Sequence, residues 1–411
     1  MLPKKKVLII GAGAAGQMAS IAALLNNNEV ILAEKNNILG KKLRITGKGR
    51  CNMTNACSID EFLRNVCTNS KFLYSAVSRF SPADTIDFFV ANGLSLKVER
   101  GNRVFPTSDK AEDVANVLIK ILKKNNCKIL HKRIKALLVK DSVCLGAMCQ
   151  SGEKIYADAV ILATGGISYP STGSTGDGFK FARRCGHTIN ELKPSLVPLI
   201  CKQPFCKDLQ GLSLKNVAVS IRENPSGKKI YEDFGEMLFT HFGVSGPIIL
   251  SASCHLKDLS PCKYSIHIDL KPALDAAQLD KRILRDFGKY INKNFSNALL
   301  DLLPSKMIPI VVELSNIDPD LKCHQITKEM RARLVYILKD LTLDILDFRP
   351  IEEAIVTSGG ISTDEINPKT MESKLIERLF FAGEIIDVDA YTGGFNLQIA
   401  FSTGFLAGQS V

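Results

Sequence analysis

The segment VLIIGAGAAGQMASIAALLNNNEVILAEK, residues 7–35, decides the fold of this chain. It opens with four aliphatic residues, Val7 to Ile10, of the kind that a parallel strand buried on both faces requires. The turn GAGAAG follows at once and contains the glycine pattern G-x-G-x-x-G. Small and apolar residues then predict a helix over Gln17 to Leu25. A second aliphatic run ends at Glu34, so the order is strand, glycine turn, helix, strand and acid, which predicts a dinucleotide-binding βαβ unit.

Each part of this unit has a physical role in holding a dinucleotide. Gly11 permits the tight turn, Gly13 lets the backbone approach a pyrophosphate, and Gly16 lets the helix pack closely on the strand. The N-terminus of the helix attracts the negative charge of the phosphates. We expect Glu34 to accept hydrogen bonds from the adenosine ribose.

The rest of the chain indicates which dinucleotide is bound. ADAVILATGG, residues 157–166, predicts another buried strand, and RLFFAGEIIDVDAYTGGFNLQIAFSTGFLAG, residues 378–408, predicts a strand, a glycine turn and a helix from about Asn396. No second G-x-G-x-x-G follows a strand, since GSTGDG at 173–178 has its glycines in the wrong order. This arrangement is typical of flavoproteins of the two-dinucleotide-binding-domain type. It therefore favours FAD over a permanently bound NAD.

Composition limits the class of protein and its surroundings. With 411 residues, 45% hydrophobic and 23% charged, the chain is typical of globular proteins with more than one domain. The formal charge of +11 favours anionic partners without choosing among nucleotides, RNA and acidic membrane. Twelve cysteines without a C-x-x-C predict reduced thiols in a cytoplasmic protein. The apolar N-terminal run resembles a membrane anchor, but its three glycines argue against one, so we expect no transmembrane segment.

The middle of the chain predicts an inserted domain. Residues 193–344 hold ten of the 16 prolines but six of the 29 glycines, so composition changes at both edges. Short alternating runs predict a β-barrel over 193–271, and a helical pattern predicts a small helical subdomain over 272–344. The predicted α/β fold is thus a discontinuous Rossmann-like FAD-binding domain, 1–192 and 345–411, with this insertion. Residues 98–108 are predicted to be a surface connection.

The basic stretch KKLRITGKGRCNMTN, residues 41–55, has three possible interpretations. It is a solvated turn, an RNA-binding patch, or a cover over the FAD pyrophosphate that places residues 50–52 beside the isoalloxazine. No aromatic residue lies between Val7 and Asp60 to stack on bases, so the cofactor interpretation is favoured.

Cysteine catalysis and a metal centre are not favoured. Cys51 and Cys57 have five residues between them, which does not place both thiols on one helical face. Two C-x4-C pairs, Cys144/Cys149 and Cys201/Cys206, do not follow the cofactor loop. The six histidines are scattered and form no ligand pair, so no metal is predicted.

Four blocks of sequence resemble the BaiN-like family of NAD(P)/FAD-dependent oxidoreductases, also described as aminoacetone-oxidase-like flavoproteins. They are GKKLRITGKGRCNMTN (40–55), ATGGISYPSTGSTGDGF (163–179), GEMLFTHFGVSGPIIL (235–250) and NPKTMESKLIERLFFAGEIIDVDAYTGGFNLQIAFSTG (367–404). The resemblance runs nearly end to end. It departs at Lys48, where the family usually has glycine, and at Ala390, where glycine is common. It implies reduction of a conjugated enone, as in dehydro-bile acids.

The candidate site residues follow from these motifs and from the resemblance. Tyr391, in the turn before the last helix, and His241, in the insertion, are the candidate proton donors, with Tyr169 a weaker one. His241 can equally be a hydrogen-bonded structural histidine, and Tyr391 can serve to pack against the ring system. The residues expected to contact FAD are Gly11, Gly13, Ala14, Ala15, Gly16, Glu34, Lys35, Lys42, Leu43, Gly49, Arg50, Cys51, Asn52, Thr54, Gly165, Gly383, Glu384, Asp389, Gly394, Asn396, Leu397 and Gln398.

The functional hypothesis is an FAD-dependent oxidoreductase for which NAD(P)H is a transient reductant. Flavin N5 would deliver hydride to the conjugated double bond of a small, largely apolar molecule. The alternatives are an amine or aminoketone oxidase that uses oxygen and a tRNA-binding flavoprotein. The expected partner is a small-molecule substrate, with nucleic acid and membrane not favoured, and the expected state is a monomer or homodimer.

Overall fold

A computed structural model describes residues 4–256 and 259–411. The chain forms two compact units, unit 1 (Met1–Ser195 and Pro350–Val411) and unit 2 (Leu196–Arg349). The sequence prediction divided the chain after residues 192 and 344. The second of those positions lies inside the strand β17 (Leu341–Phe348), which belongs to unit 2.

Unit 1 is built on a five-stranded sheet in the order β19-β10-β1-β2-β6. All neighbouring strands are parallel, and Ile10 of β1 pairs with Leu162 of β10 and with Ala33 of β2. The three inner strands are almost wholly buried, as expected of a parallel sheet covered on both faces. The strands are β1 (Lys6–Ile10), β2 (Glu29–Glu34), β6 (Lys128–His131), β10 (Ala159–Leu162) and β19 (Leu379–Phe381).

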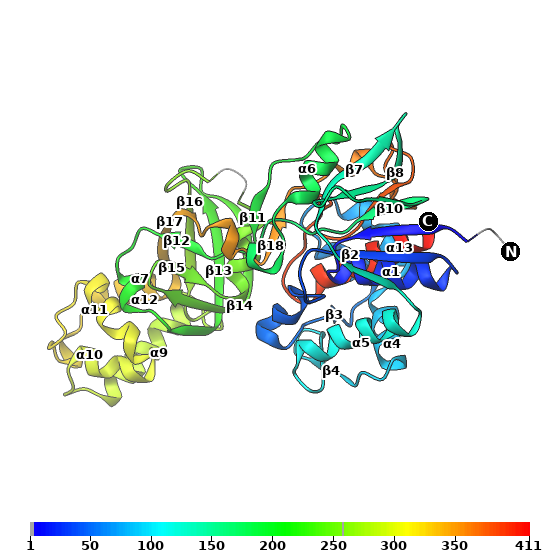
Figure 1. The fold of residues 1–411 in the computed structure, drawn as a ribbon. Helices are drawn as coiled ribbons and strands as arrows, with labels where there is room; N and C mark the ends of the chain where they lie inside the picture. Colours follow the sequence, from blue (N-terminus) through cyan, green and yellow to red (C-terminus); the bar gives the residue numbers. More distant parts are fainter. Residues whose placement is uncertain (1–3, 257–258) are drawn as a thin grey trace. The chain divides into compact units, whose positions relative to one another are not determined.

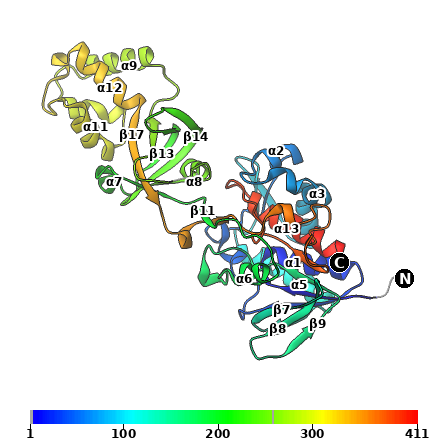
Figure 2. The same ribbon diagram turned by 90° about the horizontal axis from the view of Figure 1, so that it is seen from above.

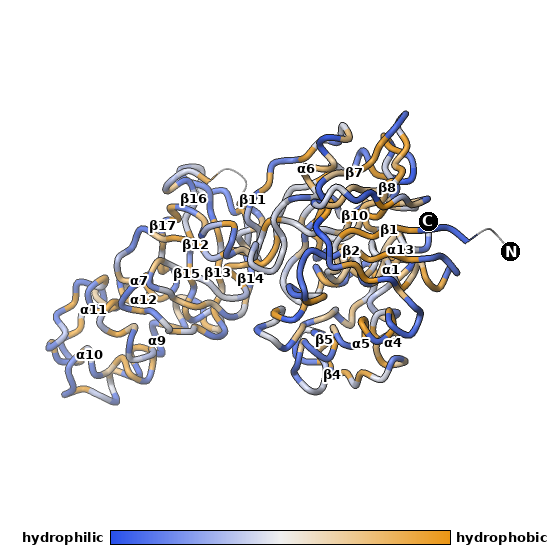
Figure 3. The backbone as a smooth tube through the Cα atoms, viewed as in Figure 1, coloured by the Kyte–Doolittle hydropathy of each residue, from blue (hydrophilic) through white to orange (hydrophobic). Residues whose placement is uncertain are grey.

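Two helices from opposite ends of the chain lie side by side against this sheet. The helix α1 (Ala14–Leu25) packs along α13 (Phe395–Ser410), and α5 (Ala111–Lys124) packs against α1 (Figure 1). The strands β1, β2 and β10 form an apolar centre, whereas polar residues predominate in the surrounding loops (Figure 3). The first and last segments of the sequence therefore share one core.

Smaller elements surround the sheet in unit 1. A three-stranded sheet joins β3 (Thr54–Asn55), β5 (Arg103–Pro106) and β4 (Leu96–Glu99), and a second joins β7 (Ile134–Lys140), β8 (Val143–Cys149) and β9 (Lys154–Tyr156). The predicted surface connection at 98–108 is thus largely a β-hairpin. Val104 and Phe105 are buried there, and pairing of β5 with β3 gives the hairpin a partner far away in sequence. The helices are α2 (Ile59–Arg64), α3 (Tyr74–Arg79), α4 (Pro82–Ala91) and α6 (Asp177–Arg184).

The chain leaves and re-enters unit 1 through two paired strands. β11 (Lys193–Ser195) and β18 (Val356–Ser358) are antiparallel, with Ser195 opposite Val356. The outgoing and returning segments are therefore neighbours.

Unit 2 combines a closed six-stranded barrel with a group of helices. The barrel order is β12-β15-β14-β13-β16-β17, so the strand that closes it follows the helices in sequence. The helices α9, α11 and α12 gather beyond one end of the barrel (Figure 2). The elements are β12 (Leu199–Cys201), α7 (Phe205–Asp208), β13 (Ser213–Glu223), β14 (Lys228–Thr240), β15 (Gly243–Ser245), α8 (Pro247–Ser253), β16 (Tyr264–Asp269), α9 (Ala276–Lys289), α10 (Phe295–Ala298), α11 (Ile308–Ser315), α12 (Lys328–Lys339) and β17.

The structure confirms the predicted α/β class, with a Rossmann-type sheet, a barrel and helices. Among the described residues, every helix is too short or too polar to cross a lipid bilayer.

Candidate functional site

The candidate FAD site lies at the carboxyl edge of the parallel sheet. Gly11 follows β1, Glu34 ends β2, Ala163 follows β10 and Gly383 lies two residues beyond β19. The register of these strands brings their carboxyl ends to one edge, where open α/β sheets bind their ligands. Four segments that are distant in sequence are thus assembled by the sheet alone.

The three glycines of the first turn differ in the space around them: two are closely packed against backbone, and one faces open space. A Cβ on Gly16 would lie 1.8 Å from the carbonyl oxygen of Gly11, and a Cβ on Gly11 would lie 2.5 Å from that of Ala163. A Cβ on Gly13 would meet nothing within 4 Å. Gly11 and Gly16 therefore hold the turn together, while Gly13 leaves open space in front of it.

The N-terminus of α1 faces this open position. The helix begins at Ala14 after Gly13, has no side-chain cap, and carries no acidic residue in its first turn. Its first N–H groups have no acceptor within the helix, so the positive end of the helix dipole is available to an anion. Ala14 and Ala15 keep the approach free of bulky side chains.

Glu34 is buried at the end of β2, with 8% of its surface exposed. Its carboxylate accepts a hydrogen bond from the Ala12 N–H at 2.8 Å, and it also accepts from the backbone and side chain of Asn36 at 2.9 and 2.8 Å. The acid is therefore fixed beside the glycine turn. The next residue, Lys35, instead donates to Thr175 and pairs with Asp177 at 3.1 Å.

Lys42 and Glu384 form the centre of a polar network at the same edge. Lys42 Nζ donates to Glu384 Oε2 and to Ser168 Oγ, both at 2.7 Å. Ser168 Oγ in turn donates to Glu384 Oε1 at 3.0 Å, and the Thr357 N–H donates to the same oxygen at 2.9 Å. Lys42 and Glu384 are predicted from the sequence, whereas Ser168 and Thr357 are not, because their small hydroxyl side chains carry no distinctive spacing.

Two other basic residues of the 41–55 stretch, Arg44 and Arg50, have separate partners. Arg44 pairs with Glu112 at 2.9 Å. Arg50 pairs with Glu99 and Asp109, and its guanidinium lies 4.3 Å from the centre of the Phe105 ring. These hydrogen bonds raise the pKa of Arg50. The side chain of Arg50 is thus directed to the β4–β5 hairpin, which leaves its backbone as the group available to a cofactor.

Lys48 adopts a left-handed backbone conformation, with φ +57°, a conformation that glycine adopts more readily than residues with a Cβ atom. Leu43 is buried in the same loop, and Gly49 has φ +83°.

Cys51 is fully buried, and its N–H donates to the Thr46 carbonyl at 3.0 Å. Burial raises the pKa of its thiol to about 12, so it is protonated at neutral pH and is no nucleophile.

Three buried polar side-chain atoms of unit 1 have no hydrogen-bond partner among the described residues; one is Gln17 Oε1 in α1, and the other two belong to loops of this site. These two are Asn52 Oδ1, next to Cys51, and Thr164 Oγ1, in the loop after β10. Because buried polar groups are rarely left unsatisfied, these atoms fit a site that a polar ligand completes. Gly165, next to Thr164, has φ +72°.

The N-terminus of α13 provides a second uncapped helix end. The helix begins at Phe395 after Gly394, with no side-chain cap and no acidic residue in its first turn. The side chain of Asn396 instead bonds both the N–H and the carbonyl of Ala390, at 3.0 and 2.6 Å. Of the residues predicted to contact flavin here, Asn396 and Leu397 therefore offer their backbone N–H groups.

The backbone N–H and the side chain of Gln398 form hydrogen bonds with other groups of the protein. Its backbone N–H donates to the Gly394 carbonyl at 3.1 Å, and its side chain accepts from Thr54 Oγ1 at 2.6 Å. Its amide nitrogen donates to the Phe80 carbonyl and to Ser402. Gln398 and Thr54 thus join α13 to β3, and these bonds use every hydrogen-bond donor of Gln398.

Asp389 lies in the loop before α13, 1% exposed. Its carboxylate accepts from Ser195 Oγ at 2.6 Å and from Ser358 Oγ at 3.3 Å, so it joins this loop to β11 and β18. Burial raises the pKa of Asp389. The loop is further held at the Gly383 N–H, which donates to Thr403 Oγ1 at 2.9 Å.

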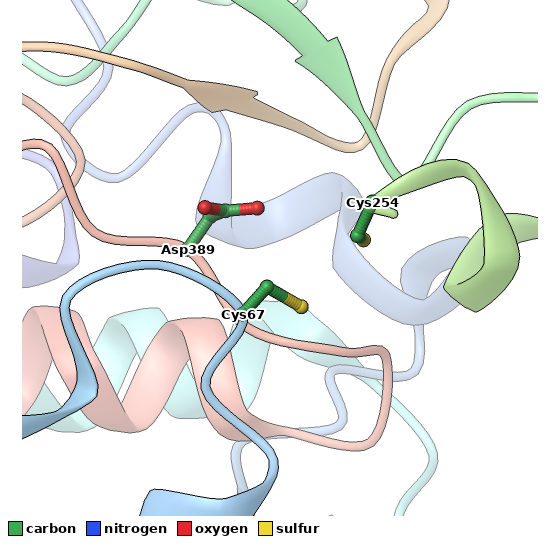
Figure 4. Close-up of side chains that lie close together, drawn as sticks. All are labelled: Cys67, Cys254 and Asp389. Atoms are coloured by element: carbon green, nitrogen blue, oxygen red, sulfur yellow. The ribbon is translucent and has the colours of Figure 1, made fainter. Parts of the chain in front are cut away.

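The side chains of Cys67 and Asp389 lie on neighbouring loops of unit 1, where the Cys67 N–H donates to the Asp389 carbonyl at 2.8 Å (Figure 4). Cys254, drawn in the same view, belongs to unit 2. Within a single unit, the described residues bring together no three side chains that are suited to hold a metal ion.

The candidate proton donors belong to different units. His241 is exposed in the turn between β14 and β15, and its ring meets the Phe242 ring edge-on at 5.0 Å. The Arg349 guanidinium lies 4.5 Å from the centre of the same Phe242 ring. Tyr391 is half-buried in unit 1, and its N–H donates to the Asn65 carbonyl at 3.0 Å. Tyr169 has a left-handed backbone with φ +50°.

The residues present fit FAD. Two uncapped helix N-termini, an open glycine position, a buried acid beside it and two orphaned polar atoms belong to segments that follow the strands of one sheet or flank its carboxyl edge. α1 would hold the pyrophosphate, Glu34 the ribose, and α13 the flavin pyrimidine.

Comparisons with known proteins identify the family to which the chain belongs. The HI0933-like protein Rossmann domain family matches residues 5–410. The chain is 34% identical over 415 residues to a 3-dehydro-bile acid delta(4,6)-reductase of Clostridium scindens, with 98% of each chain covered. It is 29% identical over 405 residues to a ribosomal RNA dihydrouridine synthase of Escherichia coli, covering 98% of this chain and 97% of the other.

Among solved structures, a 3-ketosteroid-delta4-(5alpha)-dehydrogenase from Rhodococcus jostii RHA1 matches with a TM-score of 0.54 at 15% identity, covering 99% of this chain and 96% of that one. At this identity the likeness shows a shared fold. Together with the sheet-edge site and the family match, these findings show that the chain belongs to the HI0933-like family of Rossmann flavoproteins and is an FAD-dependent oxidoreductase.

Proposed function

We propose that this oxidoreductase reduces a carbon–carbon double bond that is conjugated with a carbonyl group, with NADH or NADPH as the source of electrons. The two full-length relatives described above bear names that imply this bond. In a 3-dehydro-bile acid the oxo group is conjugated with the Δ4,6 double bonds, and uracil has a carbonyl conjugated with the bond that is saturated in dihydrouridine. The observation that carries the proposal is the sheet-edge site with its two uncapped helices.

FAD, when bound, supplies this chemistry by taking hydride from the nicotinamide and giving it to the electron-poor carbon of the substrate. The residues of the chain itself would bind FAD and orient it toward the substrate. The first N–H groups of α13 would stabilise negative charge on the flavin pyrimidine, and Glu384, bonded to Lys42 and Ser168, would position the ribityl chain. Tyr391 Oη or His241 Nε2 would deliver a proton to the carbon next to the carbonyl.

The first candidate substrate is a small, largely apolar enone, in keeping with the 34%-identical reductase. A second candidate is uridine within ribosomal RNA. The formal charge of +11 favours it, because a basic protein attracts a polyanion at long range. The oligomeric state, monomer or homodimer, stays a prediction.

The test is an anaerobic titration of the purified, FAD-loaded protein with NADH and with NADPH, monitored by flavin absorbance. Bleaching is expected with at least one of them. The reduced protein is then mixed with a 3-oxo-Δ4,6-steroid or with ribosomal RNA made by transcription, and reoxidation with formation of the saturated product is expected with one substrate. A flavin that no nicotinamide bleaches would contradict the proposal. Aerobic peroxide formation from an aminoketone would favour the oxidase alternative.

The two substrates are distinguished by salt. Turnover of RNA should fall steeply as salt rises, because phosphate contacts release counterions, whereas turnover of a neutral steroid should change little.

A further inference from the structure

Gln17 is a fully buried polar side chain in α1, a helix whose other buried residues are mostly small or apolar. It is the fourth residue of the helix, and its amide Nε2 donates to the Ala12 carbonyl at 3.0 Å. Long side chains of a helix point back toward its N-terminus. The amide of Gln17 therefore lies against the glycine turn, at the end of α1 that would hold the pyrophosphate.

The peptide groups of Ala12 join three segments of the FAD site. The Ala12 carbonyl accepts from Gln17 Nε2 and also from the Gly40 N–H at 2.9 Å. The Ala12 N–H donates to the carboxylate of Glu34 at 2.8 Å. A Cβ on Gly40 would lie 2.9 Å from Gln17 Nε2, so the segment that leads to Lys42 passes close to this amide. Gln17 thus fixes the glycine turn relative to the acid of β2 and to the loop after it.

The bond to Ala12 determines which way the amide of Gln17 is turned. A carbonyl oxygen can only accept, so the nitrogen of Gln17 must face the Ala12 carbonyl, and the reversed amide would place two acceptors together. Oε1 is bonded to the same carbon as Nε2 and therefore also lies beside the glycine turn. It is buried and has no hydrogen-bond partner among the described residues.

The chemistry of an amide oxygen restricts what can satisfy Oε1. A buried acceptor without a partner lowers stability, so a donor is expected to reach it. Phosphate oxygens only accept hydrogen bonds at neutral pH and cannot serve. An O–H group can, whether it is a hydroxyl of the ribose or ribityl chain of FAD or a water that donates both to Oε1 and to the pyrophosphate.

We propose that Gln17 is a positioning residue of the FAD site whose Oε1 accepts a hydrogen bond from an O–H group that enters with the cofactor. Its Nε2 holds the Ala12 peptide in the conformation that the pyrophosphate requires, and its Oε1 is satisfied when FAD binds. This role concerns FAD alone and does not depend on the substrate proposed above.

The test compares full-length wild type with Q17M, which has a side chain of similar size and no amide. The Kd for FAD, measured by flavin fluorescence titration, should rise roughly threefold to tenfold in Q17M because a hydrogen bond made on binding is lost. Without FAD, the Tm of Q17M should equal or exceed that of wild type, because removal of an unsatisfied buried acceptor offsets the lost bond to Ala12.

S20A is the matched control. Ser20 is also fully buried in α1, but its Oγ already donates to the Gly16 carbonyl at 2.7 Å. The Kd of S20A for FAD should therefore stay within about twofold of that of wild type, and its Tm should shift equally with and without FAD. An unchanged Kd for Q17M, or a Tm that Q17M lowers equally with and without FAD, would overturn the proposal and leave Gln17 a purely internal role.

A crystal structure of the FAD-loaded wild-type protein tests the same point without any substitution. An FAD hydroxyl, or a water that also contacts the pyrophosphate, is expected at hydrogen-bond distance from Gln17 Oε1, and the map distinguishes these two donors. Oε1 without either of them would overturn the proposal even if Q17M fails to fold.

Discussion

Glu34 is the single side chain on which FAD affinity is expected to depend most directly. Its carboxylate is fixed by Ala12 and Asn36 beside the open face of Gly13. In E34A the ribose would lose a charged acceptor, which costs about 1.5–3 kcal/mol, so the Kd for FAD should rise roughly tenfold to a hundredfold.

Flavin fluorescence titration measures this change. E29A, at the exposed start of the same strand, is the matched control and should bind FAD like wild type. Equal affinity of E34A and E29A would remove Glu34 from the site.

Asp389 predicts a pH dependence of stability. Burial raises its native pKa above the ordinary carboxyl value of 3.8, although hydroxyls from Ser195, Thr68 and Ser358 oppose the shift and Asp387 adds to it. Between 3.8 and the raised value the native state binds more protons than the unfolded chain, so the free energy of unfolding falls as pH rises through this window.

D389N cannot ionise and should not show this loss. The Tm of D389N minus that of wild type should therefore increase from pH 4 to pH 7, as measured by circular dichroism. A difference that stays constant across this range would contradict the prediction.

At the scale of residues, sequence motifs predicted which positions follow or end the strands of the sheet, and the contacts of these positions with FAD stay predictions. Gly11, Gly13, Gly16, Glu34 and Glu384 lie at one sheet edge because each follows or ends a strand. The direction of a long side chain was not predictable. Arg50 turns to Glu99 and Asp109 because a hairpin paired with β3 brings these acids close.

At the scale of elements, close contact of α1 with α13 is the feature that joins the two ends of the chain. A Cβ on Gly404 would lie 2.4 Å from the Ala15 carbonyl oxygen, and a Cβ on Gly408 would lie 2.2 Å from that of Ala19. G404A should therefore force the helices apart and lower the stability of the fold by about 1–3 kcal/mol, the usual cost of overpacking.

Thermal unfolding followed by circular dichroism tests this. Gly288 in α9 is the control, since its Cβ would meet nothing within 4 Å, and G288A should be stabilised by up to about 1 kcal/mol through helix propensity. A Tm for G404A equal to or above that of wild type would show that the helices can separate without loss.

Elements with strong local signals were predicted, and elements that depend on distant partners were not. β1, α1, β2 and α13 carry aliphatic runs and glycine turns, and the structure has them within a few residues of the predicted positions. The hairpin β4–β5 was missed because its third strand, β3, lies about forty residues earlier in sequence. The predicted boundary after residue 344 placed the second half of β17 in the FAD-binding domain. The strand that closes a barrel has no sequence signal that distinguishes it from other strands.

At the scale of the whole molecule, the division into two units predicts that FAD binding and its reduction by the nicotinamide can be separated from turnover of the substrate. All residues expected to contact FAD lie in unit 1, whereas His241 lies in unit 2. A variant in which a flexible glycine–serine linker joins Ser195 to Pro350 should retain FAD and still be bleached by the nicotinamide that bleaches wild type. Its turnover of substrate should be lost.

Absorbance spectra and product analysis measure the two properties separately. A linker variant that folds but binds no FAD would show that the site needs unit 2. A variant that keeps full turnover would exclude unit 2 from catalysis.

The chain leaves unit 1 through β11 and returns through β18, and these two strands are paired. One continuous stretch of the gene therefore encodes unit 2. Because Ser195 and Val356 are paired, recombination on either side of the intervening segment would cut no strand of the five-stranded sheet. Mutations can accumulate in this segment without disturbing the edge of the sheet that holds the cofactor. Evolution can thereby change what such an enzyme recognises while it inherits unaltered the way electrons are delivered.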